Sequence, residues 1–249
     1  ALKHLKVLQT LDLSHNRIES VPSDAAFLSM PHLWRLQLNG NRIRNITVGL
    51  FDKLESLQIL DLSSNAIQQV ERGAFDANKL LRAVRLDDNQ LTSMDSLFQN
   101  LGELIWLNMS ANRIVEFDYA MVPRNLHWLD ISHNGISELG NYFDLTEIRL
   151  GVLDASFNAL KQLGPRSIPD SIQTVLVNDN QINQVVPYTF FKKTMLSKVD
   201  LTVNDLKSID QNALRLSSDV KSLPDFFLGG NPIECDCEMV WFKSINSVN

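Results

Sequence analysis

Five aspartates occupy one position of a recurring L-D-L-S type segment and are the side chains best placed to do chemistry: Asp12, Asp61, Asp130, Asp154 and Asp200. A pair of carboxylates can hydrolyse a glycosidic bond when a pocket holds one of them protonated. We expect these aspartates on an open sheet, which offers no such pocket. The sequence also lacks the serine motif G-x-S-x-G, the zinc motif H-E-x-x-H and a phosphate-binding glycine loop. We therefore predict no enzymatic activity, no catalytic residue and no cofactor.

The aspartates could instead attract a binding partner. On neighbouring strands Asp130 and Asp154 would lie about 5 Å apart, where their like charges add and favour a basic protein. The alternative interpretation is that aspartate is common in this segment for a structural reason, being solvated and bonded to the neighbouring backbone.

Two tryptophans and a leucine complete the predicted binding surface. Trp106 and Trp128 are expected to project outward from consecutive strands, and exposed tryptophans are enriched among residues that dominate binding. Alternatively, these rings pack on flanking connections and brace the fold. Leu176 belongs to a set of outward apolar residues toward the C-terminal end that could mediate self-association: Val152, Phe157, Leu176, Val203 and Phe227.

The cysteines and two asparagine triplets indicate the compartment. Cys235 and Cys237 are two residues apart and poorly placed to bond each other, so each is expected to pair with a cysteine outside this sequence. No further Cys or His stands nearby at metal-ligand spacing, so no metal site is predicted. Disulfides indicate an oxidising compartment. The triplets at Asn45 and Asn108 match the N-glycosylation acceptor and favour an extracellular setting.

An internal repeat of about 24 residues, within the leucine-rich-repeat range, must position all of these side chains. The pattern L-x-x-L-x-L-x-x-N-x-L predicts a short strand per unit, with leucines pointing inward at the two-residue period of a β-strand. A later aromatic residue extends the core in several units: Phe27, Phe51, Phe75, Phe98 and Phe190. The asparagines should form a ladder that satisfies backbone groups where the chain bends: Asn16, Asn41, Asn65, Asn89, Asn112, Asn134, Asn158, Asn180, Asn204 and Asn231.

The repeat predicts an α/β solenoid. We expect a right-handed leucine-rich-repeat horseshoe with a parallel β-sheet on its concave face and irregular or 3₁₀ segments on its convex face. Residues 1–222 are expected to hold about nine repeat units, truncated at the N-terminus. Residues 223–249 are expected to hold the last repeat and the start of a cysteine-containing C-terminal cap, which is also truncated.

The composition excludes several classes of partner. The chain has 249 residues, 44% hydrophobic content and a formal net charge of −6. It contains no run of Lys and Arg, so neither nucleic acid nor an anionic membrane surface is a predicted partner. No apolar run approaches the ~20 residues needed to cross a bilayer. Because the sequence starts inside a repeat and without Met, we expect it to be a fragment.

Several motifs, most of them in the second half of the chain, are more specific than the repeat. In them the sequence resembles the ectodomain of insect Toll receptors, in particular the long-ectodomain group that includes 18-wheeler and Tollo. The motifs are Phe117-Asp118-Tyr119-Ala120, Asn141-Tyr142-Phe143, Leu153-Asp154-Ala155-Ser156-Phe157-Asn158, Pro187-Tyr188-Thr189-Phe190-Phe191-Lys192-Lys193, Asn212-Ala213-Leu214-Arg215-Leu216 and Gly229-Gly230-Asn231-Pro232-Ile233-Glu234-Cys235-Asp236-Cys237.

The resemblance implies a single-pass membrane receptor whose repeats lie on the extracellular side of the plasma membrane. Such a receptor acts in innate immunity, or in developmental patterning and cell–cell contact. Its partner would be a protein, either a Spätzle-type cystine-knot cytokine or another cell-surface receptor, and it could form homodimers or heterodimers. The alternative is a non-signalling leucine-rich-repeat protein, a cell-adhesion molecule or a secreted structural protein.

Overall fold

The computed structural model describes residues 5–21, 30–94, 97–140 and 147–234, together with Met239 and Trp241. The chain divides into two compact units. Unit 1 comprises Ala1–Ile114 and Ala120–Leu126, and unit 2 comprises Val115–Tyr119 and His127–Asn249.

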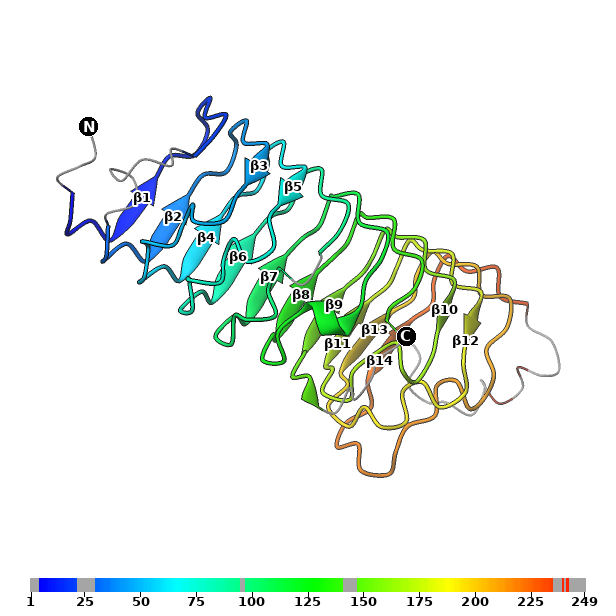
Figure 1. Cartoon of the computed structure of the whole chain (residues 1–249). Helices are drawn as coiled ribbons and strands as arrows, with labels where there is room; N and C mark the ends of the chain where they lie inside the picture. Colours follow the sequence, from blue (N-terminus) through cyan, green and yellow to red (C-terminus); the bar gives the residue numbers. More distant parts are fainter. Residues whose placement is uncertain are drawn as a thin grey trace. The chain divides into compact units, whose positions relative to one another are not determined.

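Unit 1 is built on a parallel sheet of short strands that follow one another in chain order (Figure 1). Its strands are β1 (Thr10–Asp12), β2 (Arg35–Gln37), β4 (Ile59–Asp61), β6 (Ala83–Arg85) and β7 (Trp106–Asn108). The return segments carry a second, smaller parallel pair, β3 (Asn45–Ile46) and β5 (Gln69–Val70).

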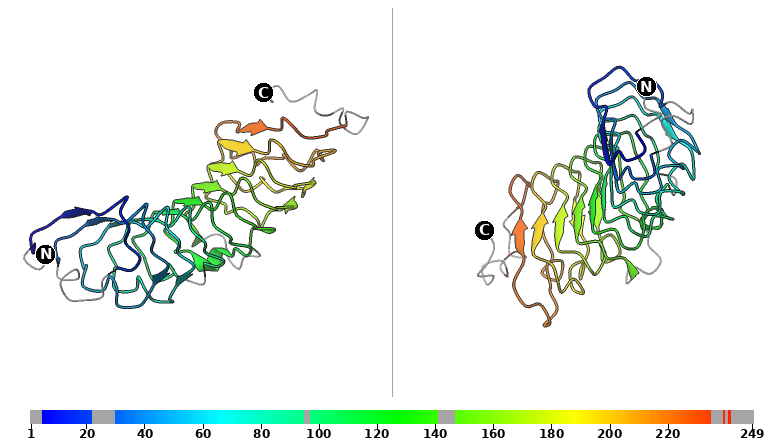
Figure 2. Two further views of the ribbon diagram at one scale, coloured as in Figure 1. Left: turned by 90° about the horizontal axis from the view of Figure 1, so that it is seen from above. Right: turned by 90° about the vertical axis from the view of Figure 1, so that its left-hand side faces the viewer.

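Unit 2 repeats this design (Figure 2). Its main sheet consists of β8 (Trp128–Asp130), β9 (Val152–Asp154), β11 (Thr174–Leu176), β13 (Lys198–Asp200) and β14 (Asp225–Phe227), all parallel. The smaller pair is β10 (Gln162–Leu163) with β12 (Gln184–Val185). A short 3₁₀ turn, η1, spans Tyr119–Met121, of which Tyr119 belongs to unit 2 and the other two residues to unit 1. Among the described residues, no helix has the length and apolar content that crossing a lipid bilayer requires.

The register explains why the repeat folds in this way. The middle residue of each main-sheet strand from β2 onward is buried, while its two neighbours are more exposed. In unit 1, Leu36 pairs with Leu60 and Leu60 with Val84, so apolar side chains stack from one turn to the next. A parallel strand pair needs a crossover, and the segments between the strands supply it. The predicted leucine-rich-repeat solenoid, with its parallel sheet and irregular return segments, is confirmed.

Phenylalanines of the return segments form a second layer of the core, which in unit 2 reaches the main sheet at Phe226. In unit 1, Phe51 stacks on Phe75 with ring centroids 6.1 Å apart, and Phe75 stacks on Phe98 at 5.8 Å. In unit 2, Phe190 meets Phe226 edge-on at 5.2 Å. Phe27, which the repeat places in the same series, lies outside the described residues.

Side-chain amides link successive turns. Asn89 donates from Nδ2 to the backbone oxygens of Leu62 in the preceding turn and Leu86 in its own turn, both at 3.0 Å. Its Oδ1 accepts a bond of 2.9 Å from the N–H of Ile67. The same arrangement recurs within each unit at Asn41, Asn65, Asn112, Asn158, Asn180, Asn204 and Asn231. Backbone groups that the bends leave unpaired are thereby satisfied.

Two of the polar side chains that unit 2 buries are a tyrosine and a lysine. Tyr119 is fully enclosed, its hydroxyl donates a bond of 2.8 Å to the backbone oxygen of Ser167, and burial raises the pKa of the phenol. Lys193 is 2% exposed, and its ammonium lies 2.8 Å from Oδ1 of Asp170 and 3.2 Å from the backbone oxygen of Pro165. The buried cation therefore has both a counter-charge and a hydrogen-bond acceptor.

Candidate binding surface

The face of each main sheet that points away from the core, called the open face below, is the candidate site. The last residue of each strand projects from it. In unit 1 these residues are Asp12, Gln37, Asp61, Arg85 and Asn108. In unit 2 they are Asp130, Asp154, Leu176, Asp200 and Phe227. Within unit 2, Asp130 pairs with Asp154, so the structure brings these two predicted binding residues together.

The aspartates of this column also have a structural role. In Asp154, Oδ1 accepts bonds from the backbone N–H of Ser156 at 3.0 Å and from its hydroxyl at 2.6 Å. The backbone N–H two residues later donates the same bond to the side-chain Oδ1 of five other residues: Asp12, Asp61, Asn108, Asp130 and Asp200. This turn explains the recurrence of D-x-S in the repeat and supports the structural interpretation of the aspartates. The bonds that Ser14 donates, from its hydroxyl and then from its backbone, lower the pKa of Asp12.

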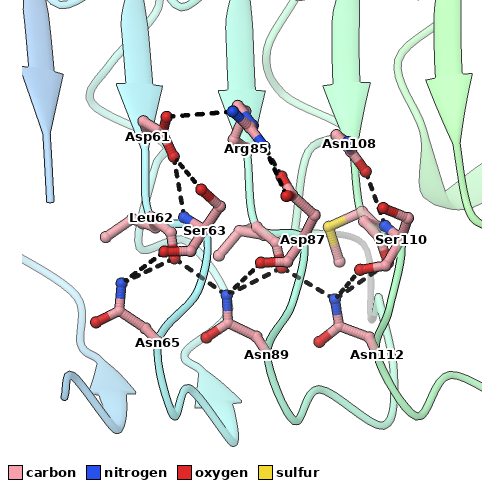
Figure 3. Close-up of polar contacts among 12 residues, drawn as sticks. Asp61, Leu62, Ser63, Asn65, Arg85, Asp87, Asn89, Asn108, Ser110 and Asn112 are labelled. Atoms are coloured by element: carbon pink, nitrogen blue, oxygen red, sulfur yellow. Dashed lines mark hydrogen bonds and ion pairs between the residues drawn. The ribbon is translucent and has the colours of Figure 1, made fainter. Parts of the chain in front are cut away.

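An arginine interrupts the aspartate column in unit 1 (Figure 3). Arg85 donates to both carboxylate oxygens of Asp87, at 2.9 and 2.7 Å, and its Nη1 lies 3.7 Å from Oδ2 of Asp61. The hydrogen bond to Asp87 is the main cause that raises the pKa of Arg85. The sequence analysis did not identify this cluster, although Arg85 and Asp87 are two residues apart and such residues point to the same side of an extended segment. The Arg85 cluster neutralises part of the negative charge of the unit 1 open face.

The predicted tryptophans begin their strands and are half-buried. Trp106 is the first residue of β7 in unit 1, and Trp128 is the first residue of β8 in unit 2. Because the two rings belong to different units, their place on one shared binding surface stays a prediction. Leu176 is half-buried and pairs with Asp154 on one side and Asp200 on the other. It therefore separates two carboxylates on the unit 2 open face.

A second column, which sequence reasoning missed, runs beside the open face. The residue before each ladder asparagine, called the rim column below, has a positive φ in both units. Glycine occupies it at Gly40 and Gly230, with φ of 67° and 74°. The other members have φ between 51° and 54°: His15, Ser64, Asp88, Ala111, His133, Phe157, Asp179 and Val203. The two glycines, with histidine, serine and aspartate elsewhere, were the available signal for this left-handed turn.

The modification sites occupy different places. Asn45 is exposed at the start of β3, on the return side. Asn108 is half-buried at the end of β7, where its Oδ1 accepts the turn bond from Ser110. Cys235 and Cys237 lie outside the described residues. Among the residues that the structure describes, no three His, Cys, Asp or Glu side chains form a group that could hold a metal ion.

Comparisons with known proteins place this surface in context. A leucine-rich-repeat family model matches residues 1–43 and 31–91. Toll-like receptor 7 of Drosophila melanogaster is 48% identical over 251 residues, an alignment that covers 100% of this chain and 17% of that receptor. The chain thus spans 17% of the length of this relative.

Two solved structures have the same fold. The crystal structure of the leucine-rich-repeat domain of APL1B matches with a TM-score of 0.76 at 24% identity, covering 91% of this chain and 65% of that one. The structure of the TLR13–ssRNA13 complex matches with a TM-score of 0.71 at 25% identity, covering 95% of this chain and 38% of that one.

Proposed function

This chain is a leucine-rich-repeat solenoid related along its whole length to part of a Toll receptor, and from that premise we propose that it is a partner-binding segment of a Toll-type receptor ectodomain. The observation that carries the proposal is the 48% identity that extends over the entire chain. The resemblance that the motifs of the second half indicate is therefore confirmed. The role that fits this architecture is a binding scaffold without enzymatic activity.

The open face supports this role. Its outward side chains are not needed to stack the turns, because the buried leucines and the asparagine amides do that work. Residues there can therefore vary to fit a partner without disturbing the core. We propose that Trp106, Trp128, Asp130, Asp154 and Leu176 contact the partner, with the tryptophans as anchors and the aspartates selecting a basic surface.

A protein is the partner that we propose, either a cystine-knot cytokine or another cell-surface receptor. In the solved TLR13–ssRNA13 complex, a different receptor is found with a single-stranded RNA. RNA binding depends on Lys and Arg that neutralise phosphates. Here the open face carries a column of aspartates, Arg85 is engaged by Asp87, and Lys198 lies over the Phe227 ring at 5.2 Å. These charges favour a basic protein over a nucleic acid.

The setting is part of the proposal. We propose that the chain lies on the extracellular side of a membrane-anchored receptor that acts in immunity or in developmental patterning and cell–cell contact. We also propose glycans on Asn45 and Asn108; because Asn108 shares β7 with Trp106, a glycan there would exclude a partner from Trp106, and binding through Trp106 requires copies of the chain whose Asn108 is unglycosylated. We further propose disulfides from Cys235 and Cys237 to cysteines outside this sequence. Finally, we propose that two receptors pair through their repeats, as a homodimer or a heterodimer.

Binding measurements on the secreted chain in its natural flanking sequence test the function. Surface plasmon resonance would compare cystine-knot cytokines, receptor ectodomains and a single-stranded RNA oligonucleotide as candidate partners. We expect a protein to bind, and we expect both Trp106→Ala and Trp128→Ala to weaken binding at least tenfold. Trp34→Ala is the matched control, because Trp34 precedes β2 and lies outside the proposed contact set. Binding of the RNA alone would contradict the proposal.

A further inference from the structure

Two large apolar residues of unit 2 occupy a backbone conformation that suits neither of them. Phe157 and Val203 belong to the rim column and have φ of 53° and 54°. Left-handed φ is common for Gly, Asn and Asp, whereas a bulky or β-branched residue is an outlier there. The same column holds Gly40, Ser64 and Ala111 in unit 1.

The structure gains little from these side chains. Phe157 is 44% exposed and Val203 is 51% exposed, so neither contributes fully to the core. The rim hydrogen bonds come from the backbone: the N–H of Phe157 donates to the oxygen of Asn178, and that of Val203 donates to the oxygen of Gly229. Any residue except proline could make these bonds. Strained, exposed and apolar positions of this kind are typical of ligand-binding sites.

The rim side chains of unit 2 form a defined arrangement. The ring of His133 stacks on that of Phe157, with centroids 4.2 Å apart and planes 20° apart. Asp179 belongs to the next turn, and its Oδ2 accepts a bond of 2.9 Å from the side chain of Asn178. Val203 follows on the turn after that, about 10 Å from Phe157 at the spacing of parallel strands. In the rim column, the acidic residue Asp179 therefore stands between an aromatic residue and a branched aliphatic one.

We propose that the unit 2 rim, defined as His133, Phe157, Asp179 and Val203, binds an arginine side chain of a protein partner. A planar guanidinium stacks on an exposed aromatic ring and pairs with a carboxylate, which is the combination that Phe157 and Asp179 present. Val203 would cover the aliphatic stem of the arginine. The inference rests on the proposed function and deepens it by naming the chemistry that the partner brings.

Charge complementarity favours an arginine from a basic protein segment over the other possible occupants of the unit 2 rim. The neighbouring open face of unit 2 carries Asp130, Asp154 and Asp200. These carboxylates attract a basic segment and repel phosphate groups. In a symmetric pair of unit 2 rims the two Asp179 carboxylates would also approach one another, with the open-face carboxylates beside them, which disfavours a second copy of this chain as the occupant.

A peptide selection tests the inference without knowledge of the natural partner. Random peptides displayed on phage would be selected on the secreted chain, and synthetic versions measured by fluorescence anisotropy. We expect the selected peptides to contain an arginine next to apolar residues. We expect Phe157→Asn and Asp179→Asn each to lower their affinity at least tenfold, and arginine amide to compete better than lysine amide.

Asparagine is chosen because it keeps the left-handed turn. Val203→Asn is therefore expected to raise the thermal unfolding midpoint while it weakens peptide binding, a combination that misfolding cannot produce. Ala111→Asn, at the same position in unit 1, is the matched control and should leave binding unchanged. Unchanged affinity in both Phe157→Asn and Asp179→Asn would overturn the inference, as would selected peptides without arginine. If Trp128→Ala abolishes peptide binding and the rim variants do not, the rim inference fails while the proposed function stands.

Discussion

Asn65 donates a hydrogen bond of 3.0 Å from its amide Nδ2 to the backbone oxygen of Leu38, a residue 27 positions earlier in the chain. The next asparagine along the ladder, Asn89, makes the same bond to Leu62 (Figure 3). The turns of unit 1 are thus fastened to one another by side chains as well as by strand pairing. The ladder leaves the open face free to carry function.

Replacing a ladder asparagine should weaken the solenoid. Asn89→Ala would leave the buried N–H of Ile67 without its acceptor, at about 1–3 kcal/mol, and would remove one of the two amide bonds that the carbonyl of Leu62 accepts, the other coming from Asn65. We expect the free energy of unfolding in urea to fall by about 3 kcal/mol. Asn16→Ala is the control, because Asn16 is exposed and bonds to Leu13 and Ser14 of its own turn. Equal losses in the two variants would contradict the ladder's role.

The buried pair of unit 2 gives a second test of stability. Asp170→Ala leaves the Lys193 ammonium buried without its counter-charge, and we expect a loss of about 2 kcal/mol in urea unfolding. Asp170 is one-third exposed, with a side-chain exposure of 33%, so water screens part of the interaction. The double variant Asp170→Ala, Lys193→Met should recover most of that loss, since an apolar side chain fills the site without a charge. A double variant as unstable as Asp170→Ala would show that the pair contributes only packing.

The turn bond at Asp12 sets a pH dependence. Ser14 lowers the pKa of Asp12 below its unfolded value, so the stabilisation is complete above the unfolded pKa and is lost as the pH falls through the folded one. A side-chain NMR titration should therefore give a midpoint for Asp12 below 3.8, the ordinary pKa of an aspartate side chain. Ser14→Ala should move this midpoint upward. A wild-type midpoint at or above that value would exclude the bond.

Glycosylation is expected at both acceptor asparagines when the chain is secreted from insect cells. Asn45 is exposed on β3, and the turn at Asn108 uses Oδ1, whereas the glycan would be carried by Nδ2. Treatment with peptide-N-glycosidase converts each carrier asparagine to aspartate, which peptide mass spectrometry detects. Thr47→Ala and Ser110→Ala should each abolish one site. An unconverted Asn45 peptide from secreted protein would disprove that site.

The sequence predicts the parts of the fold that the repeat period fixes. Leu36, Leu60 and Val84 are buried as expected, because a strand alternates with period two and the repeat aligns successive strands. The stack of Phe51, Phe75 and Phe98 follows from the same alignment. Such features depend on local pattern and on contacts between adjacent turns.

Gly40 and Gly230 signal a left-handed turn, but its extension to residues that disfavour this conformation could not be predicted. The left-handed φ of Phe157 and Val203 arises because every turn bends at that point, although the side chains themselves favour other conformations. The sequence offered a structural role for Asp154 only as an alternative to partner binding. Its bonds from Ser156 became evident only in the structure. The pairing of Arg85 with Asp87 likewise depends on side-chain conformation.

The central claim, that the open face of unit 2 binds a protein, can be tested with a single substitution. Asp154→Asn keeps the turn acceptor, as Asn108 does in unit 1, and creates the acceptor triplet Asn-Ala-Ser in the middle of the open face. Secreted from insect cells, this variant should carry one more glycan than the wild type. The double variant Asp154→Asn, Ser156→Ala lacks the glycan acceptor triplet and is the matched control.

The decisive measurement is the affinity of the Asp154→Asn variant for the protein partner found with the wild type, before and after treatment with peptide-N-glycosidase. We predict that the added glycan lowers the affinity at least a hundredfold, because it occupies the surface that the partner needs. Enzymatic removal restores the native aspartate and should restore binding, while treated wild type serves as the reference. Undiminished binding by the fully glycosylated variant would contradict the account.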